Sequence, residues 1–369
     1  MQPIKRKRVT QVGSGAYAVY LPKKWIDAWS REQREKREVD LHLINNSLLI
    51  VPVLRRRRFD AAVPTDQPSV RMMLLSAYVR GHHEVTLRPQ RGQFDEDCVA
   101  MARDFLRHLD ERLVTTVQAE QVGFMVQQDM PPPVGSGADL LRLMATKLRE
   151  MIALAAECVD SYGTRPERAV HTAQLLQTLQ EEDLSRLYHQ ALRLVANLEL
   201  PLGTVSDFQL LDLVAAELQT VGAKCVAVAH AVVGGYGLTP ADLRRPRADL
   251  TKHLATAQEL PAIVLAITRV YARSFEEARD LLQRFTEAMV ARDATTLIAL
   301  VAHANEGEET LNRRLFATIE SVVGQSGGIT PAAYTAYQVR HATGSVFSGL
   351  SRAAERAASL SAAQETTTA

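Results

Sequence analysis

The hydrophobic positions of the chain follow two different periods, and the change divides the sequence near residue 138. Before that point, short runs such as VDLHLI and SLLIVP suit β-strands, with apolar and polar residues partly alternating. After it, apolar residues recur every three or four positions over long segments, which is typical of packed helices. We therefore predict a multidomain, mainly α protein with small β-containing units before the helical part.

The pattern in residues 1–54, called the head below, predicts a small β-rich unit. Strands are predicted over 8–12 and 16–21, followed by a short helix whose first turn suits Pro22. A hairpin then turns at Asn45–Asn46, since Asn tolerates the backbone conformation of tight turns. A unit of this size buries little apolar surface alone, so we expect the head to form a homodimer.

Residues 55–68 are basic and contain prolines, and we predict a linker there. A small α+β unit is predicted over 69–130, because VRMMLLSAYVRG and DEDCVAMARDFLRHLD have helical spacing while HEVTLRP suits a strand. The segment RLVTTVQAEQVGFMVQQ is long enough to form two more strands. The following MPPPVGSG is typical of a domain boundary.

The helical part is predicted to contain two sets of three helices, separated by a loop rich in Gly, Pro and Arg. We interpret them as an internal repeat of two antiparallel three-helix bundles, over 138–234 and 250–360, with a disordered tail over 361–369. The predicted helices span 138–161, 166–198, 204–233, 252–291, 294–323 and 330–360.

Composition indicates an ordinary globular protein, with 46% apolar and 23% charged residues. We expect no membrane insertion, because no run of about 20 apolar residues occurs. MQPIKRKRV lacks a following apolar segment, so no signal peptide is expected. The cysteines at 98, 158 and 225 lie in helical patterns, which predicts small core residues in a reducing cytoplasm.

Charge is distributed unevenly along the chain. Residues 1–60 contain 14 Lys/Arg and 6 Asp/Glu, a net charge of +8, whereas the whole chain has 43 and 42. The remainder therefore carries −7. Because the N-terminal part is basic while the rest of the chain, the body, is acidic, we expect an anionic partner for the head. The alternatives are a solvated basic surface, or a head that docks on the acidic body.

Motifs for catalysis are weak, so we predict no enzyme, no catalytic residues and no cofactor. GQSGG over 324–328 spells G-x-S-x-G, but a helix rather than a strand precedes it, which predicts that Ser326 lies in an interhelical turn. GSG at 13–15 and at 135–137 lacks the lysine and the spacing of a phosphate-binding loop.

The head carries the informative chemistry. Its cations suit phosphate contacts, and the glycines at 13 and 15 allow a close approach of the backbone to DNA. A dimer would present two such patches related by a twofold axis, which suits two half-sites. The predicted DNA-binding residues are Lys5, Arg6, Lys7, Arg8, Ser14, Tyr17, Lys23, Lys24, Arg55, Arg56, Arg57 and Arg58.

In VTQVGSGAYAVYLPKKWIDAW followed by VDLHLINNSLLIVP, the head resembles the AbrB/SpoVT swapped-hairpin DNA-binding domain. The resemblance implies two interlocked chains that form one barrel-like dimer and bind DNA through basic loops. The chain departs from the family over 30–38, SREQREKRE, where members usually have a short turn containing Leu and Gly.

The helical part resembles PhoU-type phosphate-uptake regulators, which contain two three-helix repeats. LQEEDLSRLYHQALR over 179–193 and DLVAAELQTVGAKCVAVAHAV over 212–232 carry this resemblance. Together with the order of head, α+β unit and helical body, it resembles PhoU-like regulators best known from archaea. It implies partners such as a phosphate transporter or a sensor kinase.

Most of the metal-binding positions of PhoU proteins are altered here. In that family Glu-x-x-x-Asp pairs hold multinuclear metal clusters, so the substitutions predict a metal-free or weakly metal-binding body. The corresponding pairs in this chain are Glu181 and Ser185, Gln219 and Ala223, Glu308 and Asn312, and Gly344 and Ser348.

These observations predict a PhoU-like regulator of phosphate uptake or signalling that binds DNA through a dimeric head, with the helical body as its regulatory module. The alternative is a protein-interaction regulator of a phosphate transporter or sensor kinase, in which the head serves only for dimerisation. The basic residues discriminate between them, because a dimer seam does not need Lys5–Arg8 or Arg55–Arg58.

Overall fold

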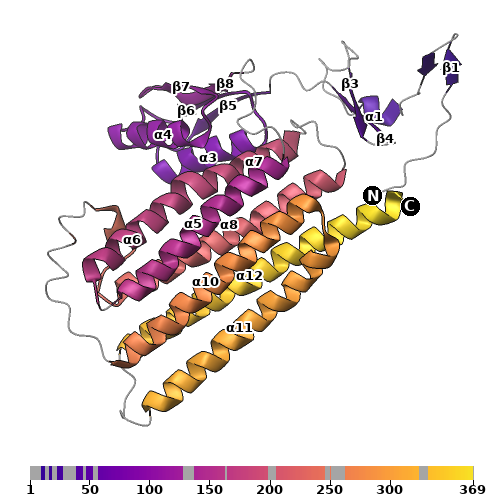
Figure 1. Cartoon of the computed structure of the whole chain (residues 1–369). Coiled ribbons are helices and arrows are strands. Elements are labelled where there is room, and N and C mark those ends of the chain that lie inside the picture. The colour runs from indigo at the N-terminus through magenta and orange to yellow at the C-terminus, as the bar shows by residue number, and fades with distance from the viewer. Residues whose placement is uncertain are drawn as a thin grey trace. The chain divides into compact units, whose positions relative to one another are not determined.

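The structure, a computed structural model, consists of two compact units, Met1–Arg57 and Arg58–Ala369 (Figure 1). It describes residues 10–12, 16–18, 23–27, 39–44, 47–52, 57–127, 137–162, 164–197, 205–245, 250, 262–323 and 331–368.

The first unit contains two antiparallel strand pairs and a short helix among its described residues. Strand β1 (Thr10–Val12) pairs with β2 (Ala16–Ala18), and helix α1 (Lys23–Asp27) follows. Strands β3 (Val39–Ile44) and β4 (Ser47–Pro52) form the predicted hairpin. The order of strand, strand, helix and hairpin is thus the one that the sequence pattern predicts.

The second unit begins with an α+β module, residues 58–127. Its elements are β5 (Arg58–Val63), α3 (Gln67–Val79), β6 (Glu84–Pro89), α4 (Glu96–Leu109), β7 (Leu113–Val117) and β8 (Val122–Val126). The four strands form one mixed sheet in the order β5-β6-β8-β7, in which β5 and β6 are parallel and the other neighbours antiparallel. The linker prediction for 55–68 was wrong over 58–63, because these residues form β5.

Local sequence explains the geometry of the module. Asp66 accepts a hydrogen bond from the Ser69 amide and Asp95 from the Cys98 amide, so each begins a helix as an N-cap. Strand β8 approaches β6 very closely at Gly123, where a Cβ atom would lie 1.9 Å from the Val85 carbonyl oxygen. Only glycine fits this position.

The rest of the second unit is the helical body, residues 137–368. Its long helical segments correspond to the six predicted ones: α5 (Gly137–Ser161), α6 (Pro166–Thr178) continuing through a π-helical segment η1 (Leu179–Leu184) into α7 (Ser185–Asn197), α8 (Val205–Gly234), α10 (Ala262–Ala291), α11 (Ala294–Val323) and α12 (Pro331–Thr368). The predicted start of the fourth helix, residue 252, lies outside the described residues. A short 3-10 helix, η2 (Asp242–Arg244), follows α8.

One hydrophobic core runs through both helical sets, α5–α8 and α10–α12. Helix α8 packs along α12, and α5 packs along α10 (Figure 1). A Cβ atom at Gly349 of α12 would lie 2.5 Å from a Val221 methyl of α8, so glycine permits this close contact. The protein is therefore mainly helical with a small four-stranded mixed sheet, as predicted at that level.

Three sequence predictions about the helical part have clear outcomes. The tail over 361–369 was predicted to be disordered, but α12 continues to Thr368, since no Gly or Pro interrupts the Ala-rich sequence before it. The three cysteines are buried and unbridged, as predicted. Ser326 lies outside the described residues. No helix among those described has the length and apolar character needed to cross a membrane.

Candidate functional site

Few of the predicted DNA-binding residues lie in described segments of the head. Tyr17 lies in β2 opposite Gln11 of β1. Lys23 and Lys24 begin α1, and the Lys23 side chain is exposed. Seven further residues of the prediction, five in the head and two in the predicted linker, lie outside the described residues: Lys5, Arg6, Lys7, Arg8, Ser14, Arg55 and Arg56. Their role in DNA binding stays a prediction.

The last two predicted DNA contacts lie on either side of the boundary between the two units. Arg57 ends the first unit, and its side chain is half-buried. Arg58 begins β5, where its Nε lies 2.7 Å from a carboxylate oxygen of Glu84 on the neighbouring strand β6. Arg58 therefore has a partner inside the α+β module. Because this ion pair is exposed, it contributes little to stability.

In the first helical set, the positions expected from PhoU proteins to hold metal instead form hydrogen bonds within the protein. Glu181 accepts hydrogen bonds from Gln177 (3.0 Å) and from the Arg244 guanidinium (2.8 Å). Burial opposes ionisation of Glu181, but the hydrogen bonds from Arg244 and Gln177 outweigh it and lower its pKa. Its negative charge is thus already compensated by Arg244.

Ser185, four residues after Glu181, forms two side-chain hydrogen bonds at the end of the π-helical segment. Its hydroxyl donates to the Gln180 carbonyl oxygen at 2.7 Å and accepts from the Gln219 amide at 3.1 Å. A π-turn changes the hydrogen-bond register of the helix, and here the Gln180 carbonyl oxygen accepts from both the Ser185 amide and the Ser185 hydroxyl. Serine and glutamine therefore form a direct contact between α7 and α8 at this site.

In the second helical set, an arginine contacts the corresponding position. Arg340 of α12 donates from Nε to the Asn312 side-chain oxygen of α11 at 3.1 Å, and its guanidinium lies 5.1 Å from the centre of the Phe316 ring. Glu308 lies beside Gly344, where an added Cβ atom would be 3.4 Å from a Glu308 carboxylate oxygen. Among the residues that the structure describes, no group of three or more His, Cys, Asp or Glu side chains could hold a metal ion.

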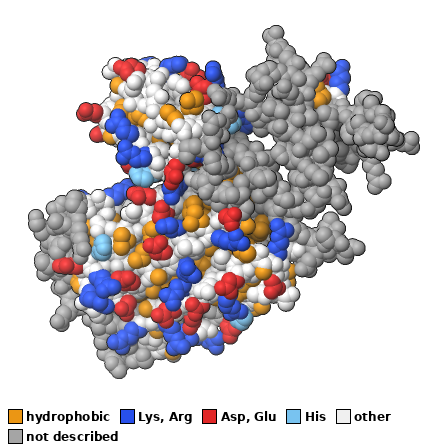
Figure 2. All heavy atoms as spheres, turned by 45° about the horizontal axis from the view of Figure 1, so that its top comes forward, with side chains coloured by type: hydrophobic (Ala, Val, Ile, Leu, Met, Phe, Trp, Pro, Cys, Tyr) orange, Lys and Arg blue, Asp and Glu red, His pale blue; other side chains and the backbone are white. Residues whose placement is uncertain are grey.

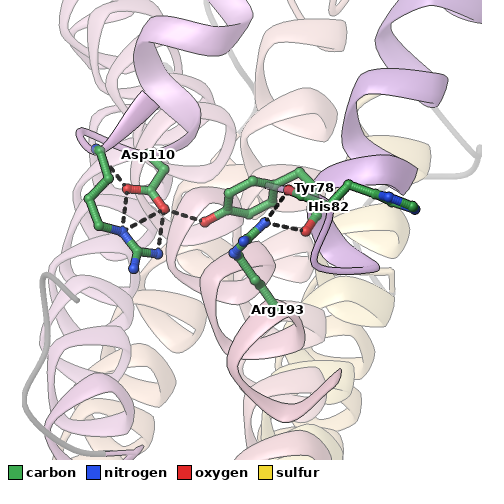
Figure 3. A network of polar contacts seen from close by, with 5 residues as sticks. Tyr78, His82, Asp110 and Arg193 are labelled. Atoms are coloured by element: carbon green, nitrogen blue, oxygen red, sulfur yellow. Dashed lines mark hydrogen bonds and ion pairs between the residues drawn. The ribbon is translucent and has the colours of Figure 1, made fainter. Parts of the chain in front are cut away.

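The best-defined polar network joins the α+β module to the helical body (Figure 3). Arg193 of α7 is fully buried and donates two hydrogen bonds, to the carbonyl oxygens of Tyr78 (2.8 Å) and His82 (3.2 Å). Both carbonyls lie at the C-terminal end of α3, where a cation is favourable. The same guanidinium lies 4.8 Å from the centre of the Tyr78 ring.

The network continues from Tyr78 into the module. The Tyr78 hydroxyl donates to Asp110 at 2.7 Å, and Asp110 forms an ion pair with Arg112 at 2.8 Å. Burial opposes ionisation of Asp110, but the hydrogen bonds from Arg112 prevail and lower its pKa. Burial and the neighbouring Asp110 charge raise the pKa of Tyr78 well above its usual range. The network thus attaches the module firmly to α7.

Sequence reasoning missed this junction. Arg193 belongs to the quoted segment 179–193, and its position between the buried Ala191 and Leu194 was a usable signal for a buried cation. Its partners could not be found in this way, because they lie more than 100 positions earlier in the chain.

A cavity of about 250 Å³ lies beside this junction, between α3 and α4 of the module and the η1–α7 segment of the body. Arg71, Phe105, Glu182, Ser185 and His189 are among the residues that line it. The sequence did not predict it, since its walls come from segments far apart in the chain.

Comparison with known proteins does not assign the chain to a family. No model of a known protein family matches the sequence, and no curated protein matches it. The resemblances to AbrB/SpoVT domains and to PhoU-type regulators therefore rest on the motifs quoted above, and their functional implications are proposals.

Proposed function

We propose that the chain is a non-enzymatic, PhoU-like regulator that binds DNA as a homodimer through its head. The observation that carries this proposal is the net charge of +8 in residues 1–60, combined with two strand pairs and a helix that begins with Lys23 and Lys24. A swapped-hairpin head would place these cations where DNA phosphates can be reached. The body would then act as the regulatory and partner-binding module.

The charges of the helical body support this division of roles. On the face shown in Figure 2, basic and acidic side chains are interspersed over the body rather than gathered by sign. Several of its cations are paired internally, such as Lys147 with Asp183 and Arg352 with Glu217. DNA binding needs a cluster of cations that is free to displace counterions, so the head is the better candidate.

The link to phosphate uptake or signalling rests on the resemblance of 179–193 and 212–232 to PhoU helices. In this proposal the head binds DNA and the body binds a partner protein. Because the two binding events are thermodynamically coupled, the partner changes the affinity of the dimer for DNA.

Fluorescence anisotropy with a labelled DNA duplex tests the proposal. We expect wild-type binding to weaken steeply between about 50 and 200 mM salt, because phosphate contacts release counterions. The double variant Lys23→Ala/Lys24→Ala should bind at least about tenfold more weakly, and each lost phosphate contact should reduce the salt slope by about 0.9. The matched control is Arg103→Ala/Arg107→Ala, which removes two exposed cations from α4.

Light scattering should show that both variants keep the oligomeric state of the wild type. Absence of wild-type binding at about 50 mM salt would contradict the proposal. The head would then serve only for dimerisation, and a phosphate transporter or sensor kinase would be the partner to pursue.

A further inference from the structure

The cavity between the α+β module and the helical body has one apolar wall. Met101, Phe105 and Leu109 recur every four residues on α4, so they share one face of that helix and line the cavity together. The Arg71 guanidinium of α3 lies 5.2 Å from the centre of the Phe105 ring. A volume of about 250 Å³ is below that of typical drug-sized sites, so the cavity suits a smaller molecule.

Two oppositely charged side chains reach this cavity without an ion-pair partner among the described residues. They are Arg71 on α3 and Glu182 in η1. Among the other charged groups of the lining, Glu181 pairs with Arg244, Arg186 lies 3.5 Å from Asp183, and the Asp104 carboxylate lies 3.6 Å from the His108 imidazole. Arg71 and Glu182 are therefore the two charged side chains that we assign to ligand contacts.

His189 adds a neutral polar group to the same cavity. Burial and, secondarily, the positive charge of Arg71 lower the pKa of His189 to about 4, so its imidazole is uncharged at neutral pH. No hydrogen bond between described residues involves its ring, which contributes to the lining of the cavity. The Ser185 hydroxyl lies on the same wall.

We propose that this cavity binds a small zwitterion with an apolar side chain, of the amino-acid class. Its carboxylate would pair with Arg71, its ammonium group with Glu182, and its side chain would lie against Met101, Phe105 and Leu109. A simple anion fits less well, because the carboxylates of Asp104, Glu181 and Glu182 also line the cavity. This inference goes beyond DNA binding, since it gives the second unit a small-molecule ligand.

Isothermal titration calorimetry on the full chain, without DNA, tests the inference. The probes are L-leucine, L-methionine and L-phenylalanine, together with two truncated analogues of leucine: 3-methylbutylamine lacks the carboxylate, and 4-methylpentanoate lacks the ammonium group. We expect at least one amino acid to bind with a Kd of about 1 mM or tighter. Where leucine binds, each truncated analogue should bind at least about tenfold more weakly, because one charged contact is lost.

Variants locate the site and separate its two charges. Arg71→Gln and Glu182→Gln should each weaken amino-acid binding about tenfold or more, whereas Arg103→Gln, an exposed change on α4 outside the cavity, should leave it unchanged. Each variant should affect only one of the two truncated analogues. Arg71→Gln should weaken the binding of 4-methylpentanoate, which keeps the carboxylate, and Glu182→Gln should weaken the binding of 3-methylbutylamine, which keeps the ammonium group.

Three results would overturn the inference. They are no binding of any of the three amino acids at about 10 mM, amino-acid binding that neither variant changes, and tighter binding of inorganic phosphate than of the amino acids. The last result would define a simple anion site. Because these titrations contain no DNA, their failure would leave the proposed function of the head unaffected.

Discussion

The two helical sets of the body share one core and the same three-segment pattern, yet their middle segments differ. In the first set, α6 passes through the π-helical η1 into α7, which packs against α3 and α4 of the module. In the second set, α11 is one uninterrupted helix, and its Ile298 and Phe316 side chains are 61% and 55% exposed. The module thus covers the middle segment of one set, while α11 keeps large apolar side chains in solvent.

This difference identifies the middle segment of the first set as the one that contacts the module. A π-turn costs hydrogen-bond geometry, and such turns concentrate at functional sites. Here η1 contains Glu181, lies on one wall of the cavity, and ends nine residues before the buried Arg193. In α11, Asn312 accepts a hydrogen bond from Arg340. Comparing matched substitutions in the two sets tests this interpretation.

The largest difference is expected for the buried arginine of the first set. Arg193→Met keeps much of the side-chain volume but removes this donor from the buried Tyr78 carbonyl oxygen and the partly buried His82 carbonyl oxygen, so we expect a loss of about 2–4 kcal/mol in the free energy of unfolding. The control in the second set is Arg313→Met on α11, an exposed position where the change should stay within about 0.5 kcal/mol.

Urea unfolding followed by circular dichroism measures both variants. Equal effects of the two substitutions would show that Arg193 is not a special junction. Hydrogen exchange should additionally localise the loss to α3 and α7.

The sequence alone predicted the helices of both sets well, because long amphipathic periods leave little ambiguity. The predicted range 294–323 is that of α11, and α8 differs from its prediction by one residue at each end. Proline at 166 and at 331 begins a helix in each case, where its missing amide is not needed.

What the sequence did not reveal depends on local register or on long-range contacts. The π-turn at η1 keeps the helical hydrophobic pattern, so periodicity does not detect it. Strand β5 was taken for linker because a run of arginines precedes RFDAAV, and only its pairing with β6 defines it. The Arg193 junction and the cavity bring together residues from 71 to 109 with residues from 181 to 193. No local pattern specifies such pairings.

A second matched pair tests the stabilisation of the π-turn. Ser185→Ala removes the bonds to the Gln180 carbonyl and the Gln219 amide, both partly buried, so we expect a loss of about 1–2 kcal/mol. Ser345→Ala on α12 removes one exposed bond to a carbonyl of the same helix and should change stability by less than about 0.5 kcal/mol. Thermal unfolding of both variants in the same buffer gives the comparison. A Ser185→Ala variant as stable as Ser345→Ala would mean that η1 does not depend on its serine.

The smallest effect is expected when a carboxylate is introduced at Asn312 of the second set. In Asn312→Asp the new carboxylate would accept a charge-assisted bond from Arg340, worth about 0.2–1 kcal/mol at a partly exposed site. Glu308 lies four residues earlier on the same helix, and its like charge opposes this gain by about 0.2–0.5 kcal/mol. The net change should therefore be a stabilisation of about 0.5 kcal/mol or less, measured by urea unfolding, and it should shrink as salt is added. A clear destabilisation would mean that the charge of Glu308 outweighs that of Arg340. Stabilisation by added Mn²⁺ would mean that one added carboxylate near Glu308 suffices to create a metal site in the second set.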